Sequence, residues 1–349
     1  STGASSVWTF SDGGSGLDQR LISDKATTIH RCNKSQASAS EIIAAQKQQQ
    51  THVLRWEERQ GGKPMPGSLT TLIESNLRRA GRLLMDADAV LIGAGAGMSV
   101  DSGLPDYRVT RGFWTAYPAF AGRTYAEIAG PTLMQDKPEQ AWAFFGHCFE
   151  LYRKTPPHVG YFKLRETLEQ LGKEYFVFTS NIDGFFRRSD YLCSSIYEVH
   201  GSINRLQCRR GLDCGSHTWS AEDLHIEVDL EQMLATSPLP RCIKCEDFAR
   251  PNVLLFGDRH WVPHAVIKEE NLYEAWLAKL RAEGKQIVTI ELGAGQAVPT
   301  VRIECQRRSR NLIRVNPYEF EAAPHCLSLP LNALEAIEQI VTAVKDLMA

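Results

Sequence analysis

Two kinds of pattern alternate along the chain from residue 88 onward. Short runs of Val, Ile, Leu and Phe end in Gly, Asn or Asp, and between them lie longer segments whose apolar residues recur every three or four positions. The runs are typical of buried strands, and the longer segments of helices with one buried face. Strands are expected within residues 88–95, 174–181, 195–202, 250–257, 285–295 and 311–316. Helices are expected over residues 138–153, 159–171, 269–282, 299–308 and 332–347.

Regular alternation of strands and helices predicts the fold class. It indicates an α/β architecture in which a Rossmann-like parallel sheet is covered by helices on both faces. Residues 203–249 interrupt the alternation and hold two pairs of cysteines, so we expect a small zinc-binding module inserted there. Residues 67–349 then form one catalytic domain that contains this module.

The beginning of the chain differs from the rest in composition. Residues 1–40 are rich in Ser, Gly and Thr and cannot build a core by themselves. Residues 39–60 are rich in Ala, Glu and Gln, which favours a helix, and the sequence GGKPMPGS then breaks it. We expect an N-terminal arm over residues 1–66, partly flexible and with one helix.

Composition and charge narrow the classes of function. The chain has 349 residues, 43% of them hydrophobic, which is enough to bury a large core. A formal net charge of -2 provides no general field for nucleic acid, so no direct nucleic-acid binding is expected. No apolar run reaches the roughly 18 residues of a membrane span, and no secretory signal is apparent at the start of the sequence. We therefore expect no membrane partner and an intracellular protein, in the cytoplasm.

The first predicted strand runs into the segment LIGAGAGMSVDSGLPDYR, residues 91–108. Closely spaced glycines between a strand and a helix offer backbone N–H groups to a diphosphate. The dehydrogenase spacing requires a third glycine where Met98 stands, and no Gly-Lys-Ser/Thr follows. Asp106, Tyr107 and Arg108 add groups that can hydrogen-bond, stack and pair with phosphate. A turn kept for close packing alone is the alternative interpretation.

This segment and its continuation resemble the sirtuin family, the NAD-dependent protein deacylases, whose pattern is close to GAGxSxxSGxPDFR. Two extra residues precede Ser99, and the matching positions are Gly93, Ala94, Gly95, Ser99, Ser102, Gly103, Pro105, Asp106, Tyr107 and Arg108. Further segments similar to family motifs follow in the same order: TSNID (179–183), VHGS (199–202), RPNVLLFGD (250–258), ELGAGQAVPTVR (291–302) and RVNPYE (314–319). The resemblance covers about residues 70–347.

The resemblance implies NAD as cofactor and gives roles to particular residues. The expected cofactor-binding residues are Gly93, Ala94, Gly95, Ser99, Asp106, Tyr107, Arg108, Ser180, Asn181, Asp183, Gly293, Ala294, Gly295, Asn316 and Cys326. The expected catalytic residues are His200, as general base, and Asn181 and Asp183, at the nicotinamide end. The residues expected to line the substrate cleft are His200, Val253, Phe256 and Gly257.

The residues alone support these roles only in part. A histidine at a strand end can act as a general base near neutral pH without a large change in pKa. Asn181 and Asp183 are also the residue types that favour turns and helix N-caps, and capping is compatible with cofactor contact. Glu291 has no expected role beyond contact with a ribose hydroxyl.

Three departures from the family pattern concern the cofactor and the cleft. Ser180 stands in place of Gln, Asp258 in place of Glu, and residues 293–296 read GAGQ where Ser or Thr hydroxyls are usual. The departures leave the acyl preference open more than they weaken NAD binding, because a second glycine-rich turn still offers N–H groups to phosphate.

Four of the nine cysteines indicate a metal site. Cys242 and Cys245 have the spacing of a zinc knuckle, and Cys208 and Cys214 form an earlier pair with five residues between them. We expect a closed, structural zinc site, because so short a polar module has too little core to hold its shape otherwise. Four unrelated thiols are the alternative, as is a site in which His217 replaces one cysteine.

Two other motifs have simpler explanations than function. The aromatic stripe of Trp142, Phe144, Phe145 and Phe149 has helical spacing and is expected to be core. The sequence Pro156-Pro157-His158 is expected to be a loop and a helix start.

Three functions are consistent with the residues and the resemblance. The first is NAD-dependent deacylation of protein lysine, which yields nicotinamide and O-acyl-ADP-ribose and has an acylated protein as its partner. The second is ADP-ribosyl transfer to a protein or hydrolysis of NAD, suggested by the altered GAGQ turn. The third is a non-catalytic module that senses NAD or ADP-ribose, which the presence of His200, Asn181 and Asp183 argues against.

Overall fold

The computed structural model describes residues 69–105, 120, 123–308 and 310–349. The predicted N-terminal arm, with its helix and its boundary at residue 66, lies outside these residues. Asp106, Tyr107 and Arg108 also lie outside them. The domain boundaries and the roles of these three residues therefore stay predictions.

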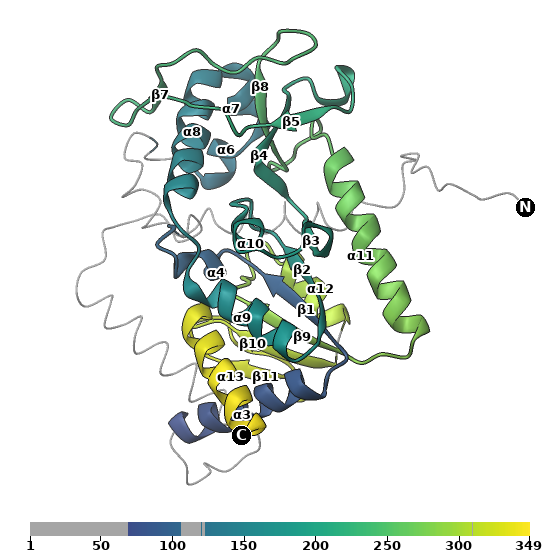
Figure 1. The fold of residues 1–349 in the computed structure, drawn as a ribbon. Helices are drawn as coiled ribbons and strands as arrows, with labels where there is room; N and C mark the ends of the chain where they lie inside the picture. Colours follow the sequence, from purple (N-terminus) through teal and green to yellow (C-terminus); the bar gives the residue numbers. More distant parts are fainter. Residues whose placement is uncertain (1–68, 106–119, 121–122, 309) are drawn as a thin grey trace, which may run out of the picture. The chain divides into compact units, whose positions relative to one another are not determined.

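The centre of the fold is a sheet of six parallel strands (Figure 1). Their order across the sheet is β11 (Leu327–Leu329), β10 (Asn311–Val315), β9 (Ile287–Leu292), β1 (Ala89–Ala94), β2 (Glu174–Thr179) and β3 (Ile196–Glu198). Five of these strands were predicted, and β11 was not, because three residues are too short for a clear hydrophobic run. The predicted parallel α/β architecture is confirmed.

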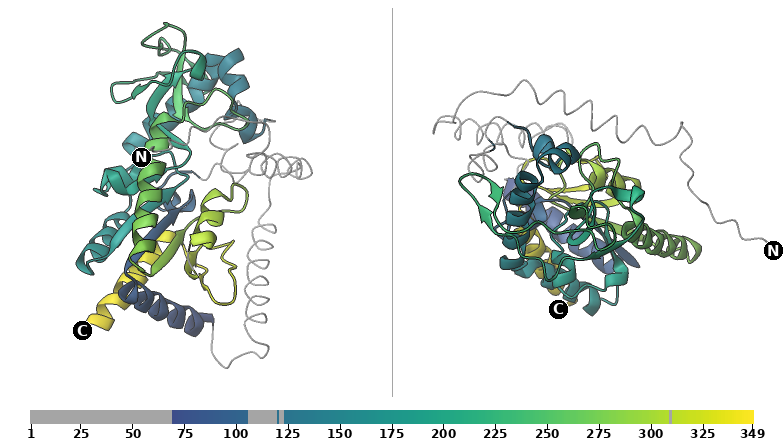
Figure 2. Two further views of the ribbon diagram at one scale, coloured as in Figure 1. Left: turned by 90° about the vertical axis from the view of Figure 1, so that its right-hand side faces the viewer. Right: turned by 90° about the horizontal axis from the view of Figure 1, so that it is seen from above.

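Helices cover both faces of this sheet. One face packs against α3 (Leu69–Asp86), α9 (Val159–Gln170) and α13 (Ala333–Met348), and the other against α11 (His264–Ala282) and α12 (Thr300–Arg308). Figure 2, seen from above, places α11 (green) and α13 (yellow) on opposite sides. Strand β1 shows why: Val90 and Ile92 belong to the core on the α3 side, and Leu91 to a second core with Tyr273 and Leu277 of α11.

The predicted strand at 250–257 does not join the parallel sheet. Its residues form β8 (Ala249–Val253), which pairs antiparallel with β4 (Gly201–Cys208) in a separate three-stranded sheet with β5 (Thr218–Ser220). The chain leaves the region of the parallel sheet along β4 and returns to it along β8, so the two strands run in opposite directions. A two-stranded ribbon, β6 (Val228–Asp229) and β7 (Leu234–Ala235), lies between them in the sequence.

Three helices pack with these strands at the top of Figure 1: α6 (Tyr125–Ile128), α7 (Pro131–Asp136) and α8 (Pro138–Lys154). The aromatic stripe of α8 is buried, as predicted. Its Trp142 Nε1 donates to the carbonyl of Ala249 at 3.0 Å, and Arg153 donates to the carbonyl of Leu224 at 3.0 Å. The inserted strands therefore share a core with α8.

Within the described ranges, no helix has both the length and the apolar composition that crossing a membrane requires.

Candidate functional site

The candidate site lies where the strand order reverses. From β1 the chain proceeds to β2 and β3 on one side and later returns to β9 on the other side of β1. In open parallel sheets, ligands bind at the carboxyl ends of the strands at such a point. The glycine turns after β1 and after β9 meet there, since the N–H groups of Gly95 and Gly97 donate to the carbonyls of Leu292 and Gly293, each at 3.0 Å.

The two turns touch backbone to backbone. A Cβ atom added to Gly95 would lie 2.7 Å from the Cα of Ala294, and one added to Gly97 would lie 2.7 Å from the Cα of Gly293. Gly293 itself has a φ of +62°, which favours glycine. Glycine is therefore required on both sides of the contact. Close packing explains these glycines, and it is compatible with the predicted binding of a diphosphate at the same turns.

The contact leaves some main-chain donors available for a ligand. In residues 93–99 and 293–296, the N–H groups of Ala96, Ala294 and Gly295 have no acceptor in the described part of the chain. The carbonyl of Ala294 is occupied, since it accepts from Asn316 Nδ2 at 3.0 Å and from Arg302 at 2.9 Å. These two side chains occupy the carbonyl of the second turn. The turn therefore offers its N–H groups as donors and can bind an anion.

A polar cluster lies beside the first turn. Asn181, just after β2, directs both of its amide hydrogens inward, to the carbonyl of Gly95 at 2.9 Å and to Ser99 Oγ at 3.1 Å. Ser99, on the short helix α4 (Gly97–Val100), donates to Asp183 Oδ2 at 2.7 Å. The structure thus brings three predicted residues together, and the Oδ1 of Asn181 is left to accept a further hydrogen bond.

Asp183 combines two functions in one carboxylate. Its Oδ1 accepts from the N–H of Phe185 at 2.9 Å, in the first turn of α10 (Phe185–Arg188), while its Oδ2 accepts from Ser99. Burial raises the pKa of Asp183, and the hydrogen bonds from Ser99 and Phe185 oppose that rise. The N-cap residue of α10 is Gly184, so Asp183 is not the helix N-cap; its bond to Phe185, two residues on, is that of a turn and is compatible with membership of the polar cluster.

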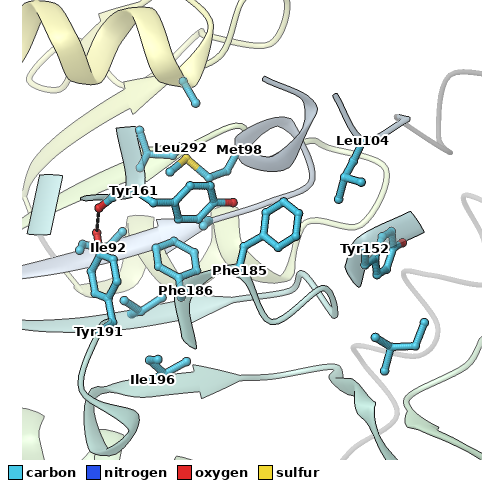
Figure 3. Close-up of a cluster of buried hydrophobic side chains, with 14 of the residues drawn as sticks. Ile92, Met98, Leu104, Tyr152, Tyr161, Phe185, Phe186, Tyr191, Ile196 and Leu292 are labelled. Carbon is cyan, nitrogen blue, oxygen red and sulfur yellow. Dashed lines mark hydrogen bonds between the residues drawn. The ribbon is translucent and has the colours of Figure 1, made fainter. Parts of the chain in front are cut away.

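Tyr161 belongs to the same cluster and was not predicted. It lies on α9, is fully buried, and its hydroxyl is 3.1 Å from Ser99 Oγ. Figure 3 shows its ring among the aromatic residues Phe185, Phe186 and Tyr191. In the sequence Tyr161 occupies an apolar position of an amphipathic helix. Only its hydroxyl distinguishes it from the other core residues of that helix.

His200 lies in the tight turn between β3 and β4, at the carboxyl end of β3. Its Nε2 is 3.4 Å from Thr300 Oγ1, at the beginning of α12, and its carbonyl accepts from the N–H of Leu254 at 2.9 Å. The side chain is half-buried. Thr300 is a second neighbour that the sequence did not reveal, because it follows Val298-Pro299 as an ordinary helix start.

The other predicted substrate-lining residues lie at the end of β8 and in the loop after it. Val253 pairs with Gly201, the neighbour of His200, in the ladder between β8 and β4. The loop that contains Phe256 and Gly257 is closed by an ion pair between Arg250 and Asp258, both buried, with Arg250 also donating to the carbonyl of Val253 at 3.0 Å. The shorter Asp in place of Glu still makes this pair.

A cluster of four charged residues supports the segment before His200. Glu198 of β3 accepts from Arg187 of α10 at 2.9 Å, and Glu269 of α11 accepts from Arg187 at 2.8 Å and from Arg205 of β4 at 2.9 Å. The N–H of Glu198 also donates to Glu269 at 2.9 Å. Burial raises the pKa of Glu198 to about 7, against the effect of the Arg187 guanidinium.

Other predicted residues have different surroundings. Glu291 forms a buried, two-point ion pair with Arg314 on the neighbouring strand at 2.7 and 2.9 Å, so the expected contact with a ribose hydroxyl is not supported. Gly93 lies within β1, where a Cβ would meet the Sγ of Cys305, and thus allows α12 to approach the sheet. Cys326 immediately precedes β11, the outer strand of the sheet, and packs against the second core, which includes Leu312 of β10.

The two predicted cysteine pairs form one cluster. The sulfur atoms of Cys208, Cys214, Cys242 and Cys245 all lie within 4.8 Å of one another. The ring of His217 is 3.4 Å from the sulfur of Cys242 and stacks on Trp219. Four sulfur donors at this spacing fit the tetrahedral coordination of structural zinc, and the N–H of Lys244 adds a hydrogen bond to Cys242 at 3.4 Å.

Comparison with known proteins identifies the family. The model of the Sir2 family matches residues 95–275, more than half of the chain. An NAD-dependent protein deacylase of Thermococcus kodakarensis is 27% identical over 276 residues, which cover 78% of this chain and 97% of that protein. An NAD-dependent protein deacylase of Desulfosudis oleivorans is 25% identical over 285 residues, which cover 79% of this chain and 98% of that protein.

Solved structures share the fold. A crystal structure of a Sir2 homolog in complex with NAD has a TM-score of 0.58 at 22% identity, covering 78% of this chain and 94% of that chain. A second structure, of a Sir2 enzyme, has a TM-score of 0.57 at 25% identity, covering 78% of this chain and 99% of that chain. With the ordered motifs and the family match, these similarities show that the chain belongs to the Sir2 family.

Proposed function

We propose that this chain is an NAD-dependent protein-lysine deacylase that releases nicotinamide, O-acyl-ADP-ribose and the unmodified lysine. The observation that carries the proposal is the meeting of Ser99, Asn181 and Asp183 beside the joined glycine turns, with His200 at the end of the neighbouring strand β3. Similar proteins named NAD-dependent protein deacylase match over nearly their whole length, which agrees with this assignment.

Bound NAD supplies the bond between nicotinamide and ribose that the reaction breaks. The N–H groups of Ala96, Ala294 and Gly295 are suited to the diphosphate, because they are donors with no acceptor in the described part of the chain. Asn181 and Asp183 hold the nicotinamide end, with Asn181 Oδ1 as an acceptor for its carboxamide N–H. Ser180 and Asn316 complete the predicted set at the carboxyl ends of β2 and β10.

His200 acts as the general base of the proposed reaction. Once the acyl oxygen has displaced nicotinamide from the ribose, His200 Nε2 would take a proton from a ribose hydroxyl, so that this oxygen can bond to the acyl carbon and the lysine amine, with water, can leave. The acylated lysine of a protein partner reaches it past Val253, Phe256 and Gly257, whose loop is fixed by Arg250 and Asp258. Zinc in the Cys208, Cys214, Cys242 and Cys245 cluster is structural in this proposal.

Replacement of His200 tests the proposal. In His200→Ala we expect steady-state formation of deacetylated peptide from NAD and an acetyl-lysine peptide to fall at least about a hundredfold, since a general base contributes that much or more. The affinity for ADP-ribose, measured by calorimetry, should change by less than about threefold, which is under 1 kcal/mol. His225→Ala, at an exposed histidine of the inserted module, is the matched control.

Two outcomes contradict the proposal. Loss of ADP-ribose binding together with activity in His200→Ala would assign this residue to folding or binding instead. Failure of the unmodified chain to release nicotinamide with a panel of acyl-lysine peptides would remove the deacylase assignment altogether.

The altered GAGQ turn favours one second candidate, in which the same bond of NAD is broken but ADP-ribose passes to a protein side chain or to water. The turn has no hydroxyl at residues 293–296 to hold the nucleotide as the family pattern does. Mass analysis of an acylated protein target separates the two reactions, because deacylation subtracts the acyl mass and the alternative adds ADP-ribose.

A further inference from the structure

The Tyr161 ring is fixed in place from several sides. It contacts the His158 ring with centroids 4.7 Å apart, and the Phe186 and Phe185 rings edge to face at 4.9 and 6.0 Å. Its main-chain carbonyl accepts from the hydroxyl of Tyr191 at 2.9 Å, the dashed line in Figure 3. With no exposed surface and its ring held in this way, Tyr161 can present its hydroxyl in only one direction, toward Ser99.

His158, the N-cap residue of α9, joins this helix to α4. Its Nδ1 accepts from the N–H of Gly160 at 3.0 Å, and its Nε2 lies 2.9 Å from the carbonyl of Met98, the neighbour of Ser99. One side of the Tyr161 ring therefore packs on a residue that is itself bound to the Ser99 segment. The distance between the Tyr161 and Ser99 hydroxyls is set by both helices.

Counting hydrogens around Ser99 gives the direction of each bond. The hydroxyl has one hydrogen and two lone pairs. The hydrogen goes to Asp183, at the short distance of 2.7 Å, and one lone pair accepts an amide hydrogen of Asn181. The second lone pair is left for Tyr161, which must then be the donor. Burial raises the pKa of the Tyr161 hydroxyl well above its usual range, so it keeps the hydrogen it donates.

We propose that Tyr161 is a positioning residue for the nicotinamide end of the site, acting through Ser99 on Asn181 and Asp183. The inference rests on the proposed function, because it assigns the Ser99 cluster to nicotinamide. By filling the last lone pair of Ser99, Tyr161 holds that hydroxyl toward Asp183. Asn181 is then fixed with its amide hydrogens inward and its Oδ1 outward, an arrangement that selects a primary amide, with its N–H donors, as the ligand.

The hydrogen bond from Tyr161 to Ser99 also favours the charged form of Asp183. Burial raises the pKa of this carboxyl, and the Ser99 hydrogen bond opposes that rise. A hydroxyl that is itself accepting a hydrogen bond is a stronger donor, because successive hydrogen bonds polarise one another. Tyr161 therefore supports both the orientation of Asn181 and the ionised form of Asp183 without touching the ligand.

Removal of a single oxygen tests this inference. In Tyr161→Phe we expect the KM for NAD and the inhibition constant of nicotinamide to rise about tenfold, the effect of one lost buried hydrogen bond. ADP-ribose affinity should stay within about twofold, because ADP-ribose lacks nicotinamide. Tyr273→Phe is the matched control: it also removes one buried hydroxyl with one hydrogen bond, to Glu304 at 2.9 Å, but in the second core on the α11 side of the sheet. We expect it to lower the melting temperature as Tyr161→Phe does while leaving both kinetic constants unchanged.

A double-mutant cycle with Ser99→Ala shows whether Tyr161 acts through Ser99. The tenfold effect of Tyr161→Phe should disappear when Ser99 is already Ala, since the hydroxyl then has nothing to position. If Tyr161→Phe is too unstable to purify, Ser99→Ala alone still tests whether the cluster of Ser99, Asn181 and Asp183 binds nicotinamide. Additive effects, or equal kinetic constants in Tyr161→Phe and Tyr273→Phe, would overturn the inference while the proposed function stands. A wild-type chain that binds neither NAD nor ADP-ribose would contradict the proposed function itself, and the inference with it.

Discussion

Single residues in the site are held by contacts that leave one atom available. Asn181 uses both amide hydrogens on Gly95 and Ser99, so its oxygen is the atom that can accept a further hydrogen bond. Two contacts hold His200, since its main-chain carbonyl accepts from the N–H of Leu254 at 2.9 Å and its Nε2 lies 3.4 Å from Thr300 Oγ1. A hydroxyl at 3.4 Å is a weak partner that a stronger acceptor or donor can displace.

Thr300 is expected to tune His200. In Thr300→Val the side chain keeps its shape but loses the hydroxyl, so the imidazole loses one of the contacts that orient it. We expect kcat for nicotinamide release to fall about three- to tenfold, the range for one neutral hydrogen bond, with ADP-ribose affinity unchanged. Steady-state kinetics and calorimetry measure the two quantities.

Thr300→Ser is the matched control, because it keeps the hydroxyl and removes only a methyl group. It should restore most of the rate. If Thr300→Ser is as slow as Thr300→Val, the methyl group and not the hydroxyl matters, and the orienting role is wrong.

Sequence alone reached some of these residues and not others. The resemblance pointed to Ser99, Asn181, Asp183 and His200 because they lie inside ordered motifs. Tyr161 lies outside them, on a helix that only the tertiary fold brings close, and looks like an ordinary core residue. Thr300 lies inside the segment 291–302 but looks like an ordinary helix-start residue, and the resemblance gave it no role. Glu291 was assigned toward the ligand because its partner Arg314, on the neighbouring strand, could not be inferred from spacing.

At the scale of elements, the four-residue charge cluster joins four segments around the His200 turn. Arg187 lies on α10, Glu198 on β3, Arg205 on β4 and Glu269 on α11. The helix that follows Asn181 and Asp183 is thereby tied to the strand that precedes His200. A buried charge left without its partner is strongly destabilising, so these segments are expected to keep their relative positions together.

Glu198 makes stability depend on pH. Its pKa is 4.5 in an ordinary setting and is raised to about 7 here, mainly by burial, so between these values the folded chain holds a proton that the unfolded chain releases. This contribution to the free energy of unfolding is fully present below about pH 4.5 and is lost as the pH rises through about 7. We expect Glu198→Gln to lack this loss, so that from pH 5 to pH 8 the wild type falls relative to the variant by about 2 to 3 kcal/mol.

Denaturant unfolding at the two pH values measures the difference. Glu231→Gln, at an exposed carboxylate of the inserted module, is the control and should follow the wild type. Parallel pH profiles for the wild type and Glu198→Gln would show that Arg187 and Arg205 keep Glu198 ionised throughout, contrary to this expectation.

Elements were predicted well where the hydrophobic pattern was long. Strands β1, β2, β9 and β10 came from continuous apolar runs, and the ends of α8, α9, α12 and α13 differ from prediction by at most about two residues, the usual uncertainty of such boundaries. The run at 250–257 showed a strand but not its partner, since parallel and antiparallel pairing of a buried strand have the same pattern. Strand β11 was too short to stand out.

In the described part of the molecule as a whole, the cysteine cluster and the parallel sheet depend on different forces. The sheet is buried between two layers of helices, whereas the cluster joins Cys208 at the end of β4 to three cysteines in the loops between β4 and β5 and between β7 and β8. Strand β4 begins at Gly201 and ends at Cys208, so it links the turn of His200 to the cluster. Metal at the cluster is therefore expected to affect the site through β4.

Zinc content and chelation test this arrangement. We expect about one zinc per chain by atomic absorption, and strong chelation should abolish nicotinamide release while most helical circular dichroism remains. Cys245→Ser should lose the metal, because it removes one of four ligands, and Cys193→Ser, at an exposed cysteine outside the cluster, should keep it. Full metal content in Cys245→Ser would favour a different ligand set, with His217 as the nearest substitute.

The joined glycine turns have a consequence for how such chains vary. Because no methyl group fits between Gly95 and the Ala294 backbone, a side chain gained by one turn has to be matched by a retreat of the other. The two turns, far apart in the sequence, are thus expected to change together. A distant homologue would be recognised more surely by the two glycine turns together than by either turn alone.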